Sequence, residues 1–212
     1  MSRPGRRLWT TSRQVIGNLL PLIAVLIPAI PISLGVVRNG VTWPAIGQLL
    51  GCIAFGVLVL NYLGLFGNRG MQRKFSLRYP ALYPDAPAPT VFVGFARPDH
   101  KSLLDPHEDN GFRTLTDVSV AFRGEIHEVD IPKHCIESIR LRPNIHSWLW
   151  LGGWVSFEAK IADKTIRLDI EPRKYHTLFA NARFRRRFVK EAQAWLKTAQ
   201  APAEAQTENS PE

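Results

Sequence analysis

The sequence predicts a helical membrane hairpin followed by an α+β domain, and three observations support this fold class. Residues 15–67 are almost entirely apolar and contain a single charged side chain, Arg38. From residue 91 the chain has seven short runs of β-forming residues separated by turn residues. An amphipathic helical pattern then covers residues 177–199. We therefore expect a seven-stranded barrel or sandwich capped by a C-terminal helix.

The apolar stretch is long enough for two membrane spans. A bilayer core about 30 Å thick is crossed by about 20 helical residues, so we place the spans at residues 15–37 and 44–66. Residues 38–40 connect them, because Asn-Gly tolerates the positive φ angles of a tight turn. Prolines in the first span predict a kinked helix: they are Pro21, Pro28 and Pro31.

Basic residues flank the apolar stretch on both sides and predict its orientation. Residues 1–14 are basic with no acidic side chain, and the segment after the second span is also basic. The positive-inside rule places both termini in the cytoplasm. Because a second span follows at once, we expect an uncleaved anchor in the cytoplasmic (inner) membrane rather than a signal peptide. The flanking basic residues are Arg3, Arg6, Arg7, Arg13, Arg69, Arg73, Lys74 and Arg78.

A linker is predicted between the hairpin and the domain. Residues 68–90 are first basic and then proline-rich, and the prolines of residues 79–90 favour an extended spacer. The domain is expected at residues 91–199. Residues 200–212, rich in Ala, Gln, Glu and Pro, predict a disordered tail.

The composition narrows the class of partner. A formal net charge of +9 suits an anionic membrane surface or nucleic acid. The hairpin favours lipid, and no nucleic-acid recognition motif accompanies the charge. Cys52 and Cys135 form neither a disulfide framework nor a zinc-ligand spacing, which favours a reducing compartment. No catalytic motif and no cofactor is predicted.

The domain is expected to alternate strands and turns before its final helix. The predicted strands are residues 91–97, 112–116, 119–123, 126–131, 136–141, 154–161 and 165–170. The apolar side chains that recur on one face of the helix are Leu178, Ala182, Phe188, Val189, Ala192, Trp195 and Leu196.

The order of these elements resembles that of the bacterial PH-like and GRAM domains. The resemblance rests on the Leu-Thr-Asp hairpin of residues 111–124, Val-Asp-Ile-Pro at 129–132, Ile-Glu-Ser-Ile at 136–139 and the Leu-Gly-Gly-Trp turn at 151–154. It covers residues 91–197, and some members of that superfamily also have two spans ahead of the domain. The resemblance implies a membrane-tethered binding or assembly module and transfers no catalytic residue.

Two basic segments are candidate contacts with anionic lipid headgroups or with another membrane protein. Arg140 and Arg142 precede Trp148 and Trp150. Indoles suit the headgroup boundary and guanidinium groups pair with phosphate. The alternative is that some of the tryptophans fill the core of the barrel. The second segment lies on the final helix, opposite its apolar face, where it faces either a membrane or solvent: Arg183, Arg185, Arg186, Arg187 and Lys190.

Two other functions remain open. Gly47 and Gly51 have the spacing that lets helices approach closely, either within the hairpin or against a second copy, as in a structural subunit or homo-oligomer. A membrane-anchored metal-dependent hydrolase using the His107 loop is the other alternative, although the spacings match no recognised metal site. The residues with suitable ligand atoms are His107, Glu108, Asp109, His127, His134 and His146.

Overall fold

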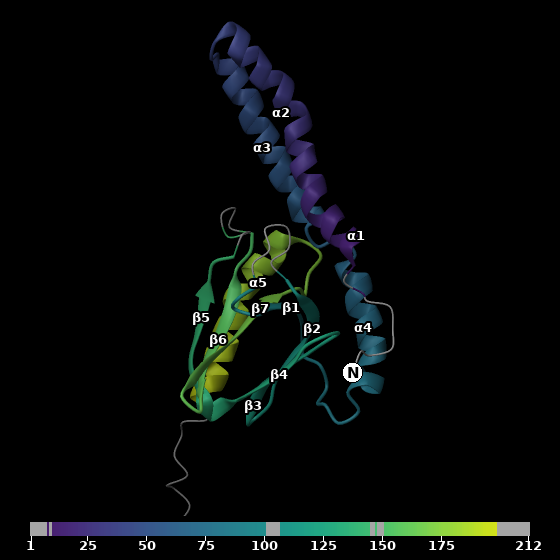
Figure 1. The fold of residues 1–212 in the computed structure, drawn as a ribbon, viewed down its shortest axis with the longest axis vertical. Helices are drawn as coiled ribbons and strands as arrows, with labels where there is room; N and C mark the ends of the chain where they lie inside the picture. The colour runs from purple at the N-terminus through teal and green to yellow at the C-terminus, as the bar shows by residue number, and fades with distance from the viewer. Residues whose placement is uncertain (1–7, 9, 101–106, 145–146, 148–150, 199–212) are drawn as a thin grey trace, which may run out of the picture.

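The structure is a computed structural model that describes residues 8, 10–100, 107–144, 147 and 151–198. A long helical hairpin projects from a domain built on one bent antiparallel sheet (Figure 1). The order of elements agrees with the sequence prediction: helices come first, then seven strands, then a C-terminal helix.

Two long helices form the hairpin. α1 (Thr11–Gln14) leads through a π-helical turn, Val15–Leu19, into α2 (Leu20–Asn39), and α3 (Trp43–Leu63) returns alongside it. Both α2 and α3 are long and apolar enough to cross a membrane. The irregular turn lies just ahead of Pro21, which has no N–H to continue the α-helical hydrogen bonding.

The two helices pack closely at Gly56. A β-carbon there would lie 1.9 Å from Cγ2 of Val25 on α2. At Gly47 and Gly51 nothing lies within 4 Å of that position, so these two glycines do not contact α2 in the structure, and packing against a second copy stays a prediction. Five residues turn an α-helix by about 140°, so Gly51 and Gly56 lie on different faces of α3.

The seven strands form one antiparallel sheet in the order β4-β3-β2-β1-β7-β6-β5. The first strand therefore pairs with both the second and the last. The two edge strands are consecutive in the chain, joined only by the short helix Lys133–Cys135, so the sheet must curl to bring its edges together. The strands are β1 (Val91–Ala96), β2 (Asp109–Leu115), β3 (Ser119–Gly124), β4 (Glu128–Pro132), β5 (Ile136–Arg142), β6 (Trp154–Ile161) and β7 (Lys164–Pro172).

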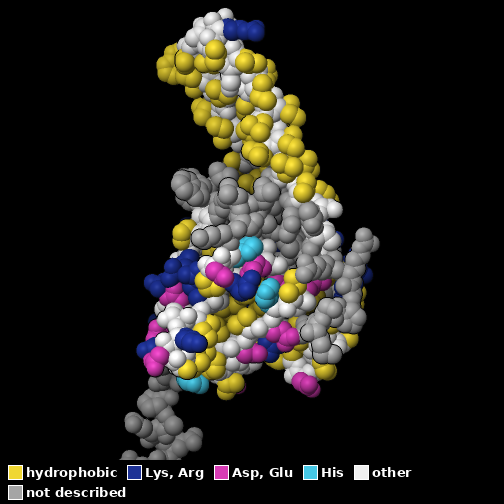
Figure 2. All heavy atoms as spheres, in the orientation of Figure 1, with side chains coloured by type: hydrophobic (Ala, Val, Ile, Leu, Met, Phe, Trp, Pro, Cys, Tyr) yellow, Lys and Arg dark blue, Asp and Glu magenta, His cyan; other side chains and the backbone are white. Residues whose placement is uncertain are grey.

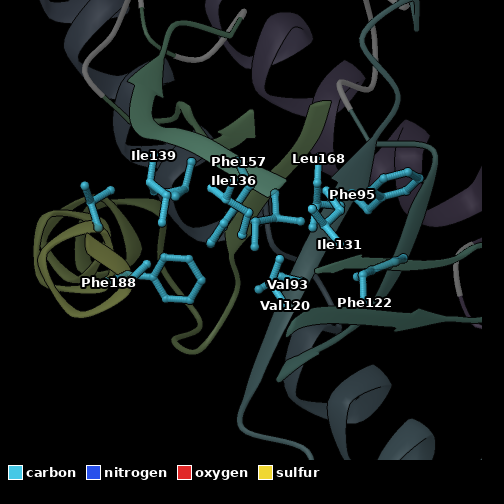
Figure 3. Close-up of a cluster of buried hydrophobic side chains, with 14 of the residues drawn as sticks. Val93, Phe95, Val120, Phe122, Ile131, Ile136, Ile139, Phe157, Leu168 and Phe188 are labelled. Carbon is cyan, nitrogen blue, oxygen red and sulfur yellow. The ribbon is translucent and has the colours of Figure 1, made fainter. Parts of the chain in front are cut away.

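The C-terminal helix α5 (Leu178–Lys197) covers the inner face of this curled sheet. Phe188 points from α5 toward the apolar side chains of the strands, among them Ile136 and Ile139 (Figure 3). Near the end of the helix, the indole N–H of Trp195 donates a 2.7 Å hydrogen bond to the carbonyl oxygen of Thr116. The predicted apolar face of this helix is thus the face that closes the core.

Residues 68–82 form a further helix, α4 (Asn68–Leu82), where the sequence predicts a linker. An extended conformation is therefore wrong for residues 79–82. The backbone N–H of Tyr83 continues the helical pattern by donating a hydrogen bond to the carbonyl oxygen of Tyr79. Pro80 is tolerated in this last stretch because burial on the outer face of β1 and β2 outweighs its cost. The side chains buried there recur at every fourth position: Met71, Phe75, Tyr79 and Tyr83.

Candidate functional site

The base of the hairpin is packed directly against the domain. Oδ1 of Asn61, in the last turn of α3, accepts a 2.8 Å hydrogen bond from the amide N–H of Phe179. The side-chain amide of Asn68 donates to the carbonyl oxygens of Arg173 and Tyr175, at 2.6 and 3.1 Å. These bonds join the hairpin to the segment that leads into α5.

Apolar contacts reinforce this joint. Leu65, Leu151 and Leu178 form a buried cluster that combines the end of the hairpin, the β5–β6 connection and the start of α5. A β-carbon on Gly64 would lie 2.7 Å from the carbonyl oxygen of Leu60 and 2.8 Å from Cδ1 of Leu178, so glycine suits this close approach. Both segments with predicted basic contact residues therefore meet the hairpin base, the first near its end at Leu151 and the second at its start at Leu178.

Arg140 and Arg142 share one carboxylate partner at the end of β5. Both guanidinium groups form ion pairs with Glu158 on β6. The side-chain hydrogen bond from Arg140, together with those from Arg142 and Ser138, lowers the pKa of Glu158 to about 2. Two cations against one anion leave a net positive charge at this end of the sheet.

The basic residues of α5 do not all lie on one face. The exposed ones are Arg183, Arg186, Arg187 and Lys190. Arg185 is half-buried, and its guanidinium donates a 3.4 Å hydrogen bond to the carbonyl oxygen of Gly153 and lies 3.7 Å from Glu171. Burial lowers the pKa of Arg185. The predicted position opposite the apolar face is wrong for this residue, since it follows Leu178 by seven positions and shares its side of the helix.

One hollow of about 420 Å³ brings the two predicted basic segments together. Arg142 lines it from β5, and the glycines at 152–153 and the hydroxyl-bearing Ser147 line it from the β5–β6 connection. None of the described lining residues is acidic. The lining arginines from α5 are Arg183, Arg185 and Arg186, whereas Arg140, Arg187 and Lys190 lie elsewhere.

The predicted tryptophan contacts Trp148 and Trp150 lie outside the described residues. Charged side chains gather on the domain, whereas the visible face of the hairpin is apolar along its length, with a basic group at its tip (Figure 2). Of residues 15–67, only Arg38, which ends α2, carries a charge. The electrostatic character of the molecule thus changes sharply at the hairpin base.

The His107 loop is part of the domain interior. His107 is buried, its Nε2 lies 2.9 Å from the carboxylate of Glu171, and its ring occupies the space that a β-carbon on Gly94 would need. The same carboxylate accepts hydrogen bonds from the side chain of Asn144 at 3.1 Å and the amide of Gly153 at 3.0 Å. Glu171 therefore connects three segments next to the basic hollow.

The acidic neighbours of His107 serve other contacts. Glu108 pairs with Arg97, whose side-chain hydrogen bond lowers the pKa of that carboxylate to about 2. Asp109 accepts 2.8 Å hydrogen bonds from the amides of Ile126 and His127 in the β3–β4 turn, and burial raises its pKa. Within the described ranges, no three His, Cys, Asp or Glu side chains are grouped as metal ligands.

Comparison of the chain with known proteins identifies no relative. No protein-family model, curated protein or solved structure matches the chain. The geometry of the hairpin base and the basic hollow is therefore the basis for inferring a function.

Sequence reasoning missed the residues that hold this region together. Asn61 and Asn68 are polar side chains at the end of a long apolar stretch, a position that signals a polar contact. Glu158 and Glu171 lie within β6 and β7, and no local sequence feature distinguishes them from other strand residues. Their roles depend on arginines from a neighbouring strand and from α5, which only the fold brings near.

Proposed function

We propose that α2 and α3 anchor this chain in the cytoplasmic membrane and that its PH-like domain binds anionic lipid headgroups at the membrane surface, in a scaffold or assembly role. The exposed apolar side chains of the hairpin support the anchor. They include Leu22, Ile27, Leu50 and Phe55. Water-soluble monomers rarely expose apolar surface on this scale, and a bilayer would cover it.

The architecture supports the PH-like assignment. A seven-stranded antiparallel sheet closed by one C-terminal helix is what the resemblance in residues 91–197 implies. Such a domain next to two apolar helices fits a binding module held at a membrane. With more basic residues at both ends of the hairpin base than at its tip, the positive-inside rule orients the domain toward the cytoplasm.

The observation that carries the proposal is the basic hollow at the hairpin end of the domain. Arg142, Arg183 and Arg186 approach it from two elements, and the neighbouring Leu151 and Leu178 touch the hairpin base. With the hairpin in a bilayer, these cations lie on the headgroup side of the domain. Each basic residue near an anionic leaflet contributes about 1 kcal/mol to the attraction.

The test compares the full chain in two kinds of nanodisc, one of phosphatidylcholine and one containing phosphatidylglycerol as well. A bound headgroup stabilises the folded domain, so its melting temperature should be higher with phosphatidylglycerol. The double variant Arg183→Gln/Arg186→Gln should lose most of this difference. The control, Lys190→Gln/Lys197→Gln, removes the same charge from exposed positions farther along α5 and should keep it. Equal melting temperatures of the unmodified chain in both nanodiscs would exclude lipid recognition.

A second candidate function is that of a structural subunit assembling through α3. It is favoured by one observation: Gly47 and Gly51 are exposed, with open space where a side chain would stand. A second helix can approach closely along such a face. Replacing both glycines with leucine should abolish any dimer seen by cross-linking in membranes, and an unchanged cross-linking pattern would reject this role.

A further inference from the structure

A second cavity, of about 620 Å³, lies beside the first turns of α5. Three aromatic side chains form part of its wall: Tyr175, Phe179 and Phe184. Two arginines, Arg183 and Arg187, line it one helical turn apart, so they face the same side of α5. Its size falls within the range of about 300 to 1,000 Å³ that is usual for ligand pockets.

This cavity adjoins the joint between the hairpin and the domain. Phe179, one of its lining residues, is bonded through its amide to Asn61 at the end of α3. The carbonyl of Tyr175, another lining residue, is held by Asn68 at the start of α4. If α2 and α3 span the bilayer, the cavity therefore lies at the level of the lipid headgroups.

The chemistry of the lining is amphiphilic. The rings of Tyr175 and Phe184 meet edge to face with centroids 5.7 Å apart, and the ammonium group of Lys174 lies 5.0 Å from the Phe184 centroid. No acidic side chain is among the described lining residues. In the described part of the chain, neither Arg183 nor Arg187 has an ion-pair partner. Unneutralised cations beside an apolar aromatic wall favour a ligand with an anionic head and an apolar body.

The geometry points to this cavity as a binding site for one anionic glycerophospholipid of the adjoining leaflet. Arg183 and Arg187 bind the phosphate. The aromatic wall formed by Tyr175, Phe179 and Phe184 contacts the glycerol and the upper acyl chains. This inference rests on the proposed function and narrows it. Lipid recognition becomes a saturable site with one lipid, in place of a general attraction between a basic surface and the membrane.

Two neighbouring arginines provide a matched test. Arg186 and Arg187 are both exposed on α5, but Arg187 lines this cavity and Arg186 lines only the other hollow. The full chain in detergent micelles is mixed with phosphatidylglycerol or phosphatidylcholine, and native mass spectrometry counts the lipids retained. The unmodified chain should retain one phosphatidylglycerol. Arg187→Gln should weaken retention about tenfold, as expected for losing one charge-assisted hydrogen bond. Arg186→Gln removes only a general attraction and should weaken retention clearly less, and Lys197→Gln, an exposed residue that lines neither hollow, should leave it unchanged.

The aromatic wall is tested separately. Phe179→Ala should weaken the retention of phosphatidylglycerol at high salt, where electrostatic attraction is screened and apolar contact remains. Soluble glycerol phosphate carries the same head without the chains, so it should compete weakly. If glycerol phosphate displaces the lipid at equal concentration, the wall contributes nothing and the lipid site is wrong.

The outcomes separate the two proposals. If the unmodified chain prefers phosphatidylglycerol but Arg186→Gln and Arg187→Gln weaken retention equally, the one-lipid site is rejected and the general lipid function stands. If the unmodified chain retains both lipids equally, both proposals fail. Circular dichroism of each variant verifies that a loss of retention is not a loss of fold.

Discussion

The amide N–H of Phe179, in the first turn of α5, donates its hydrogen bond to the side chain of Asn61, in the last turn of α3, at 2.8 Å. The first amides of a helix have no partner within the helix. Here one of them is satisfied by a residue from the hairpin, far earlier in the chain. The bond makes the start of α5 depend on the position of α3.

Replacing Asn61 with leucine should loosen this joint. The Phe179 amide loses its acceptor, and we expect a cost of about 1 kcal/mol in the free energy of unfolding. Hydrogen exchange in the first turn of α5 should quicken, as followed by mass spectrometry of the protein in detergent. Asn39→Leu, the same change at the exposed hairpin tip, is the control. Similar exchange in both variants would argue against a coupled joint.

Removing α4 should expose the outer face of the sheet. Phe75 stacks on Phe112 of β2 with centroids 5.6 Å apart and is almost fully buried. Phe75→Ala should therefore cost about 3 to 5 kcal/mol in the full chain. A fragment of residues 87–198 should bind the dye ANS strongly, whereas residues 68–198 should bind less. Equal dye binding by the two fragments would mean that α4 does not protect the sheet.

Trp195 should contribute both apolar burial and a hydrogen bond. Trp195→Ala should lower the free energy of unfolding by about 3 kcal/mol. Trp195→Phe keeps most of the apolar contact but removes the donor to Thr116, so it should cost only about 1 kcal/mol. Urea denaturation measures both. A loss below about 1 kcal/mol for the alanine variant would contradict the packing of α5 against the sheet.

Glu158 should make stability depend on acid pH. Its pKa in the folded state is about 2, below the ordinary value of 4.5. The stabilisation is therefore fully present above about pH 4.5 and is lost as the pH falls toward 2. Glu158→Gln should cost about 2 kcal/mol at neutral pH and reduce the loss of stability in acid, to which the lowered pKa of Glu108 also contributes. Glu137→Gln, at an exposed position on the neighbouring strand β5, is the control for the loss of a carboxylate.

The β6–β7 turn is conformationally strained. Ala162 and Asp163 both have positive φ angles, 47° and 64°. Such angles suit glycine, so Ala162→Gly should raise the free energy of unfolding by about 1 kcal/mol. Ala194→Gly, in the exposed interior of α5, should lower it by about the same amount. Thermal unfolding compares the two, and a destabilised Ala162→Gly variant would contradict this turn geometry.

Periodic patterns made much of the fold predictable. All seven strands were expected within a few residues of their observed bounds, because runs of β-forming residues bounded by turn residues are local signals. The two long apolar helices and α5 follow from apolar runs and helical spacing. α4 was not predicted, because the prolines of this region favour an extended chain. The four-residue spacing of Met71, Phe75 and Tyr79 is the helical signal that was overlooked.

The candidate site was only partly predictable. The basic residues of β5 and α5 could be identified, but their convergence on one hollow depends on which strand lies beside which helix. The position of Asn61 indicates a polar contact, but no local feature identifies the Phe179 amide as its partner, because the two residues belong to elements far apart in sequence. The burial of Arg185 could have been read from its spacing to Leu178 and Phe188.

The pairing of β1 with β7 has a consequence for synthesis on the ribosome. β1 emerges early, but its second neighbour, β7, emerges only after the other five strands. Pairing between segments so distant in sequence is slow to form, and a strand whose edge is still unpaired is prone to aggregate. α4 emerges just before β1 and is already available to cover Phe92 and then Phe112. The helix can thus shield the nascent sheet until α5 completes it.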